Sequence, residues 1–307
     1  MVLPFWTSIA LLSVAQGVMV ALPRALTAPR LARLSSRRWA VIPPLSVIAF
    51  VLIARAAERA SAQGLTYLAL GAVPILAALA LGWLSHGARP ARAALVLPLF
   101  ALAWADRGGL AGEGAALILS ALSCVALGVL LAAVTPPRWL AAGIVAMAVA
   151  DTALVVSDLL QSPNNALNAA HPAVGLPRLQ SAVFGSAVMG YGDLFVAGLL
   201  GALLAVTAGR SLQLRTARLT ALLAVGLDLL FFLVNELPAT LPVALALVIL
   251  LATRRLRLPR GSGFSGAGSP GAPEQDPPDR VPSSPSPPGG PPPPRASGSR
   301  ARHPAAQ

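Results

Sequence analysis

Apolar segments long enough to cross a lipid bilayer recur along the chain from its first residues to about residue 252. A transmembrane helix needs about 20 predominantly apolar residues. Hydrophobic residues make up 56% of the chain and charged residues only 11%, which excludes a water-facing enzyme domain of any size. Since a helix satisfies its own backbone hydrogen bonds in lipid, we predict an all-α fold, a polytopic transmembrane helical bundle at residues 1–255. The expected spans are about nine, at residues 2–22, 39–54, 65–84, 93–105, 115–134, 139–160, 179–208, 219–234 and 238–252.

The composition changes after the last apolar segment. Residues 256–307 are rich in Pro, Gly and Ser, carry scattered Arg and contain almost no large apolar side chains. Such a segment buries too little apolar surface to order itself. We therefore predict a disordered, basic C-terminal tail, and a proline-recognising partner is the alternative role for it.

The basic residues are all Arg, and they alternate along the expected spans. The loops after the first, third, fifth, seventh and ninth spans hold most of them, and the net charge is +12. Positive loops stay in the cytoplasm, so we expect a bacterial inner-membrane (plasma-membrane) protein with its N-terminus outside and its C-terminus in the cytoplasm. No basic face is interleaved with aromatic residues, which argues against nucleic acid as a partner. A single cysteine, Cys124, excludes an intrachain disulfide and a cysteine-based metal site.

Four aspartates fall within or at the edge of apolar segments: Asp151, Asp158, Asp193 and Asp228. An ionisable residue in a membrane span is a candidate functional residue by default. The sixth and seventh spans are adjacent in sequence and are expected to pack antiparallel, which would bring an aspartate from each together. Two carboxyl groups that share a site do not both ionise, so one acts as an acid and the other as a base toward water, without a metal or cofactor.

Asp193 is the candidate catalytic residue of the seventh span. Its partner on the sixth span is either Asp158 or Asp151, which lie seven residues apart on nearly one helix face. Asp158 is the preferred partner, because it lies near the connection that leads into the seventh span, and Asp151 is the alternative. Asp228 is expected to be structural or to line a polar cavity.

Gly190-Tyr191-Gly192-Asp193 resembles the GxGD motif of the presenilin and signal peptide peptidase family of intramembrane aspartyl proteases. That family has nine spans, an aspartate on the sixth, GxGD on the seventh and a Pro-Ala-Leu motif at the start of the ninth. Here Pro238-Ala239-Thr240-Leu241-Pro242 opens the ninth segment. The resemblance implies hydrolysis of peptide bonds in membrane-embedded helices. It also implies that Gly190, Gly192, Pro238, Leu241 and Pro242 seat the substrate.

The sequence departs from that family in two places. Ser157 or Ala150 precedes the aspartate of the sixth span, where the family usually has an aromatic residue, and Thr240 is an additional residue in the last motif. A weaker resemblance is to the prepilin peptidases, whose first aspartate is followed by Pro-Asn, as Asp158 is by Pro163-Asn164. Their GxGD is normally followed by Lys, and Leu194 stands at that position here.

The expected partners are membrane-protein or signal-peptide-like substrate helices and the bilayer itself. We expect the prolines at the start of the last segment to leave unpaired backbone groups that pair with an unwound substrate. A proton- or cation-coupled transporter that spreads its aspartates along a path is the alternative function, and a non-catalytic membrane scaffold is the third. The sequence does not indicate a substrate or an oligomeric state.

Overall fold

The computed structural model describes residues 3–26, 35–42, 44, 45, 49, 58–157, 176–233, 237–256 and 258. These residues are mostly helical, as the sequence predicts, and they also form one small antiparallel sheet. The α-helices are α1 (Phe5–Ala21), α4 (Glu58–Leu79), α5 (Val96–Ala105), α6 (Leu110–Val134), α7 (Pro137–Val156), α9 (Tyr191–Thr207), α10 (Arg210–Asp228) and α11 (Leu241–Ala252). The strands are β1 (Ser181–Phe184) and β2 (Ala187–Gly190), and the short helical segments are η1 (Arg37–Val41), η2 (Ala80–Leu84), η3 (Pro90–Leu95) and η4 (Leu229–Phe232).

Three helices of the described part are long and apolar enough to cross a membrane. They cover Gln63–Leu84, Leu110–Val134 and Pro137–Val156. Four further apolar helices are shorter, at Phe5–Ala21, Pro90–Ala105, Tyr191–Thr207 and Leu241–Ala252. Nine spans therefore stay a prediction, because several apolar segments of the sequence form shorter helices than their length suggests.

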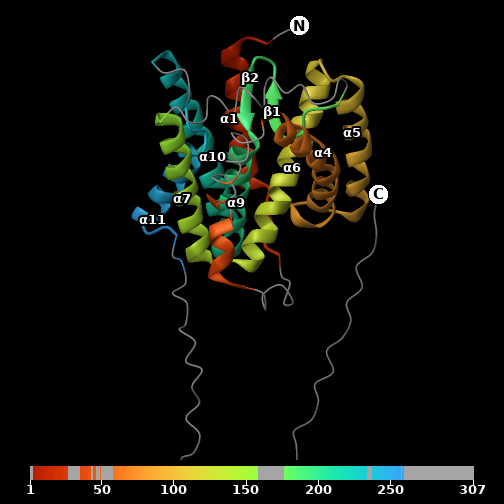
Figure 1. The fold of residues 1–307 in the computed structure, drawn as a ribbon. Helices are drawn as coiled ribbons and strands as arrows, with labels where there is room; N and C mark the ends of the chain where they lie inside the picture. Colours follow the sequence, from red (N-terminus) through yellow and green to blue (C-terminus); the bar gives the residue numbers. More distant parts are fainter. Residues whose placement is uncertain are drawn as a thin grey trace, which may run out of the picture. The chain divides into compact units, whose positions relative to one another are not determined.

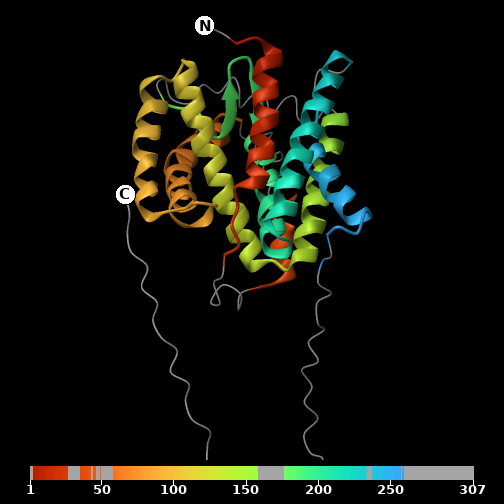
Figure 2. The ribbon, with the colours of Figure 1, turned by 180° about the vertical axis from the view of Figure 1, so that it is seen from behind.

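Helix α9 lies in the middle of the helices and is the most deeply buried of them. It packs against α6 and α7, which lie on either side of it, and against α1 (Figures 1 and 2). Helices α4 and α5 cover the far side of α6, and α10 packs along α1. The side chains of Leu199, Leu200, Leu203 and Leu204 are fully buried. The second half of α9 is thus enclosed by other helices.

Helices α6 and α9 meet at a pair of glycines. A Cβ atom added to Gly128 would lie 2.8 Å from the carbonyl carbon of Gly198, and one added to Gly198 would lie 2.9 Å from the Cys124 carbonyl oxygen. Both distances are shorter than an ordinary van der Waals contact. Small residues let two helix backbones approach this closely, as they do at helix contacts in membranes.

The prediction of one continuous span at residues 179–208 is wrong in its first third. Strands β1 and β2 pair antiparallel from Ser181 opposite Gly190 to Phe184 opposite Ala187. Gly185 has a φ of 61°, which suits the first position of a type II′ two-residue loop. A Gly-Ser pair between two apolar runs is a known hairpin signal, and it was concealed here by the continuous apolar character of the segment.

Two other boundaries differ from the predicted ones. Helix α10 begins at Arg210, not near residue 219, because its first turns are polar and extend beyond the apolar stretch. Helix α11 begins at Leu241, not at Pro238, and Pro242 takes an early helical position where a missing N–H group is tolerated. The predicted disordered tail lies outside the described residues, apart from Leu256 and Leu258.

Candidate functional site

Three helices that pack on one another each bring one polar side chain to a shared site. Helices α7, α9 and α11 are in mutual contact. Asp151 comes from α7, Asp193 from the first turn of α9, and Thr240 from the position just before α11. We call these three residues the aspartate site. They come from the expected sixth, seventh and ninth spans.

The change from strand to helix determines the position of Asp193. Strand β2 ends at Gly190, the helix begins at Tyr191, and the Gly190 N–H donates to Asp193 Oδ2 at 3.0 Å. A carboxylate in the first turn of a helix is favoured by the helix dipole. The sequence prediction placed Asp193 well inside a span, whereas it lies at the start of a helix.

The neighbouring residue fastens this helix start to α6. The hydroxyl groups of Tyr191 and Ser123 lie 2.6 Å apart, and the Cys124 thiol donates to the Tyr191 carbonyl oxygen at 3.7 Å. Ser120, one turn earlier on α6, donates to the carbonyl oxygen of Leu179 just before β1 at 2.9 Å. Asp193 therefore lies on a backbone held on both sides of the hairpin.

Thr240 holds the other carboxylate of the aspartate site. Its hydroxyl donates to Asp151 Oδ2 at 2.6 Å, and Thr240 is itself buried. Asp151 is half-buried and lies close enough to Asp193 for the charges of the two carboxylates to repel each other. In the sequence Thr240 is only an additional residue in the last motif, and in the structure its side chain bonds to Asp151 and does not cap α11.

Helix geometry places the two aspartates at matching depths. Asp151 lies fourteen residues after Pro137 in α7, and Asp193 lies fourteen residues before Thr207 in α9. At about 1.5 Å per residue, the Cα atom of each aspartate lies about 21 Å along its helix axis from that residue, and α7 and α9 pack against each other. The ambiguity between Asp151 and Asp158 arose because the start of the α9 helix was not known from the sequence.

Asp158, the preferred partner in the sequence analysis, lies outside the described residues. Helix α7 ends at Val156, two residues earlier. Within the described part, Asp151 lies within electrostatic range of Asp193. Asp228 belongs to another place in the fold, where the Ser13 hydroxyl of α1 donates to its Oδ2 at 2.6 Å.

The two glycines of the GxGD motif have different surroundings. A Cβ atom on Gly190 would lie 2.9 Å from Asp193 Oδ2, whereas one on Gly192 would meet nothing within 4 Å. Gly192 is exposed, as are Gly190 and Val188 on the same side of the hairpin. The motif thus leaves free space on one side of Asp193, and Gly192 takes no part in helix packing.

Two carbonyl groups just before α11 are paired, where we expected the prolines to leave unpaired backbone groups. The Pro238 carbonyl oxygen accepts from the Leu241 N–H at 3.1 Å, and the Ala239 carbonyl oxygen accepts from the Gln16 side chain. Pro242 is buried and Leu241 partly so. These residues help to position Thr240 and thereby Asp151, and their role toward a substrate stays a prediction.

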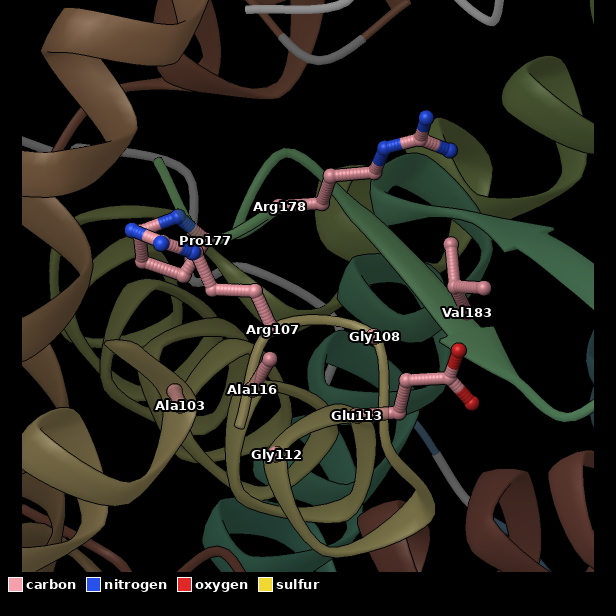
Figure 3. Close-up of a pocket in the computed structure, with 9 residues that line it drawn as sticks. All are labelled: Ala103, Arg107, Gly108, Gly112, Glu113, Ala116, Pro177, Arg178 and Val183. Carbon is pink, nitrogen blue, oxygen red and sulfur yellow. The ribbon is translucent and has the colours of Figure 1, made fainter. Parts of the chain in front are cut away.

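A cavity of about 260 Å³ lies beside the hairpin, away from the aspartate site (Figure 3). Its lining includes Arg107, Glu113, Arg178 and Val183, and none of the residues predicted from the sequence. The Glu113 side chain points toward the strand that carries Val183 (Figure 3). Its Oε2 accepts from the Gly185 N–H at 2.8 Å, so Glu113 anchors the hairpin loop to α6.

The described part of the chain contains no cluster of three or more His, Cys, Asp or Glu side chains able to hold a metal ion. Comparisons with protein-family models, curated proteins and solved structures found no match to this chain.

Proposed function

We propose that the chain is an intramembrane aspartyl protease of the GxGD type, in which Asp193 and Asp151 share one proton and activate water. The observation that carries the proposal is the convergence of Asp151, Asp193 and Thr240 from three helices that pack together. We prefer Asp151 to Asp158 as the partner, because Asp151 lies within electrostatic range of Asp193.

The chemistry requires only these two carboxyl groups. The ionised carboxylate accepts a proton from water as the water oxygen bonds to the scissile carbonyl carbon. The protonated carboxyl group then donates its proton to the departing amide nitrogen. Thr240 is a positioning residue, since its hydroxyl donates to Oδ2 of Asp151 and fixes the orientation of that carboxylate.

The substrate of this reaction is an unwound membrane helix that approaches along the open side of the hairpin. Val188, Gly190 and Gly192 are exposed in succession, and Gly192 has open space where a side chain would be. An extended peptide can hydrogen-bond to the edge of a strand, and pockets beside the strand then select its side chains. The end of β2 lies three residues before Asp193, which suits delivery of a peptide bond to the carboxylates.

The proposed topology is nine spans in the inner membrane, with the N-terminus outside and the C-terminus in the cytoplasm. It rests on the distribution of Arg, with most of the basic residues in the odd-numbered loops. In this orientation the hairpin and the aspartates lie in the outer half of the bilayer. The lipids at the opposite end are those of the cytoplasmic leaflet.

The test is cleavage of tagged membrane-helix substrates by the purified full-length protein in lipid. We expect Asp193→Asn and Asp151→Asn each to lower the rate by about 10²–10⁴-fold, the usual contribution of a general acid or base. Asp228→Asn is the matched control, because the amide oxygen of Asn still accepts the Ser13 hydrogen bond, and it should cleave as the wild type does. Asp158→Asn is compared in the same assay.

Each outcome of this series has a definite meaning. Unchanged cleavage by Asp193→Asn refutes the proposal. Loss of cleavage in Asp158→Asn with full activity in Asp151→Asn keeps the protease but replaces its second carboxylate. If the wild-type protein cleaves none of the substrates but carries a proton flux that depends on the same aspartates, the transporter alternative is correct.

A further inference from the structure

A second cavity, of about 150 Å³, lies at the end of α9 opposite to the aspartate site. Its polar lining consists of Arg24, His86, Arg210 and Gln213, and the remaining lining residues are alanines. These residues come from the chain after α1, the turn after η2 and the first turn of α10. We call it the basic cavity.

Buried Gln213 organises the basic cavity. Its side-chain amide nitrogen donates to the carbonyl oxygens of Val20, Pro23 and Gly201, at 3.1, 2.9 and 3.2 Å. Its side-chain oxygen accepts from Arg210 Nη1 at 2.9 Å. The Arg210 guanidinium also donates to the Ala21 carbonyl oxygen. These hydrogen bonds hold the Arg210 guanidinium group at the cavity.

The turn that carries His86 is joined to the same end of α1. The His86 N–H donates to the Leu22 carbonyl oxygen at 2.8 Å, and the Arg24 N–H donates to the Leu84 carbonyl oxygen at 3.0 Å. Pro23 and Ser85 form an isolated β-bridge between the two segments. This pairing brings the Arg24 and His86 side chains to one cavity although their positions in the sequence are far apart.

The basic cavity is electropositive. Among the described residues, its lining includes two guanidinium groups and no acidic side chain. Partial desolvation lowers the pKa of His86, and the charges of Arg210 and Arg24 lower it further. Helix α10 begins at Arg210 without a side-chain cap or an acidic residue in its first turn, so the positive end of its dipole adds to the same field.

We propose that the basic cavity binds a phosphate group. Guanidinium groups match the geometry of phosphate oxygens, and a basic pocket between helix ends on the cytoplasmic side of a membrane is a typical site for an anionic headgroup. The phosphate belongs either to a lipid such as phosphatidylglycerol or to a soluble anion. This inference concerns a site distinct from the aspartates and holds whether or not the protein is a protease.

The experiment measures binding to the purified full-length protein in neutral detergent by native mass spectrometry and by the shift of the melting temperature. Phosphatidylglycerol is the probe, phosphatidylcholine is the neutral lipid control, and inorganic phosphate at matched ionic strength is the soluble arm. We expect phosphatidylglycerol to bind, and Arg24→Gln to weaken its binding at least tenfold. Arg24 is the preferred position because its side chain is exposed, whereas Arg210→Gln also removes hydrogen bonds to α1 and Gln213.

Arg38→Gln is the matched control. Arg38 is exposed, lies in the Arg-rich loop after the first expected span and does not line the cavity. Its binding of phosphatidylglycerol should equal that of the wild type. Equal weakening by Arg38→Gln and Arg24→Gln would mean diffuse surface attraction and would overturn the proposal, as would absence of binding to both phosphate-bearing probes. Binding of inorganic phosphate that depends on Arg24, without lipid binding, identifies the soluble source.

Discussion

Substitution of alanine for each glycine of the GxGD motif distinguishes two effects, displacement of the Asp193 carboxylate and obstruction of the substrate. At Gly190 the new Cβ would lie 2.9 Å from Asp193 Oδ2, about half an ångström inside an ordinary contact, so the carboxylate has to move. A displacement approaching 1 Å in a catalytic group lowers a rate by up to about 100-fold. We expect Gly190→Ala to lower kcat by about tenfold or more. It also weakens the hydrogen bond from the Gly190 N–H to Asp193.

At Gly192 the same substitution meets nothing within 4 Å. Alanine in place of glycine inside a helix stabilises it by about 0.5–1 kcal/mol, so Gly192→Ala should melt at or slightly above the wild-type temperature. If the substrate occupies the open side of Gly192, the same variant loses cleavage. A tenfold fall in kcat/KM corresponds to about 1.4 kcal/mol of lost transition-state binding.

The assay is cleavage of one tagged membrane-helix substrate in lipid, with the melting temperature of each variant measured in the same preparation. The informative result is that Gly192→Ala keeps or raises the melting temperature and at the same time lowers the cleavage rate. Gly226→Ala serves as the matched control, because a Cβ there also meets nothing within 4 Å and the residue lies in α10, away from the aspartate site. Wild-type cleavage by Gly192→Ala would refute the proposed approach of substrate along the hairpin.

Three further predictions concern other parts of the molecule. Thr240→Val removes the hydroxyl that donates to Asp151, a hydrogen bond to a charged group worth about 1.5–3 kcal/mol. The substitution should reduce the cleavage rate by about 10- to 100-fold, and Thr240→Ser should restore it. Equal cleavage rates in the two variants would exclude a positioning role. Gly198→Leu should force α6 and α9 apart, because even a Cβ atom there would lie 2.9 Å from the Cys124 carbonyl oxygen, and the melting temperature should fall by several degrees. Gly209→Leu is the control and should have little effect, because a Cβ atom on Gly209 would meet nothing within 4 Å. Partial desolvation and the charges of Arg210 and Arg24 lower the pKa of His86 below 6.5. The unfolded chain therefore binds more protons at low pH than the folded chain does, and the lipid-free protein loses stability as the pH falls through about 6.5. His86→Gln should lessen that loss in melting curves between pH 7.5 and 5.5, and an identical pH dependence in the variant would contradict the assignment.

The sequence was a good guide where length and polarity alone decide the structure. Residues 115–134 and 139–160 were expected as spans, and α6 and α7 cover most of both. The breaker at Pro136 separates them as predicted, because proline is tolerated at a helix start but not inside a helix. The four aspartates also stood out without any structure, since charge in an apolar segment is rare.

The hairpin was missed because its residues are as apolar as those of the helix that follows. Hydropathy cannot distinguish a buried strand from a buried helix, and the alternation in β2 of buried Ala187 and Met189 with exposed Val188 covers only four residues. The hairpin is held by contacts distant in sequence, among them the bond from the Gly185 N–H to Glu113. A local pattern contains no such information.

The sequence by itself determined which carboxyl groups lie in apolar segments and that the chain is mostly helical, because both depend on local composition and on backbone hydrogen bonding in a low-dielectric environment. Only the tertiary structure brings Asp151 and Thr240 together near Asp193. That arrangement depends on where α9 begins and on the packing of α7 and α11 against it. The helix start at Tyr191 is in turn held by the hairpin and by the contacts of Tyr191 with Ser123 and Cys124 of α6, which are distant from it in the sequence.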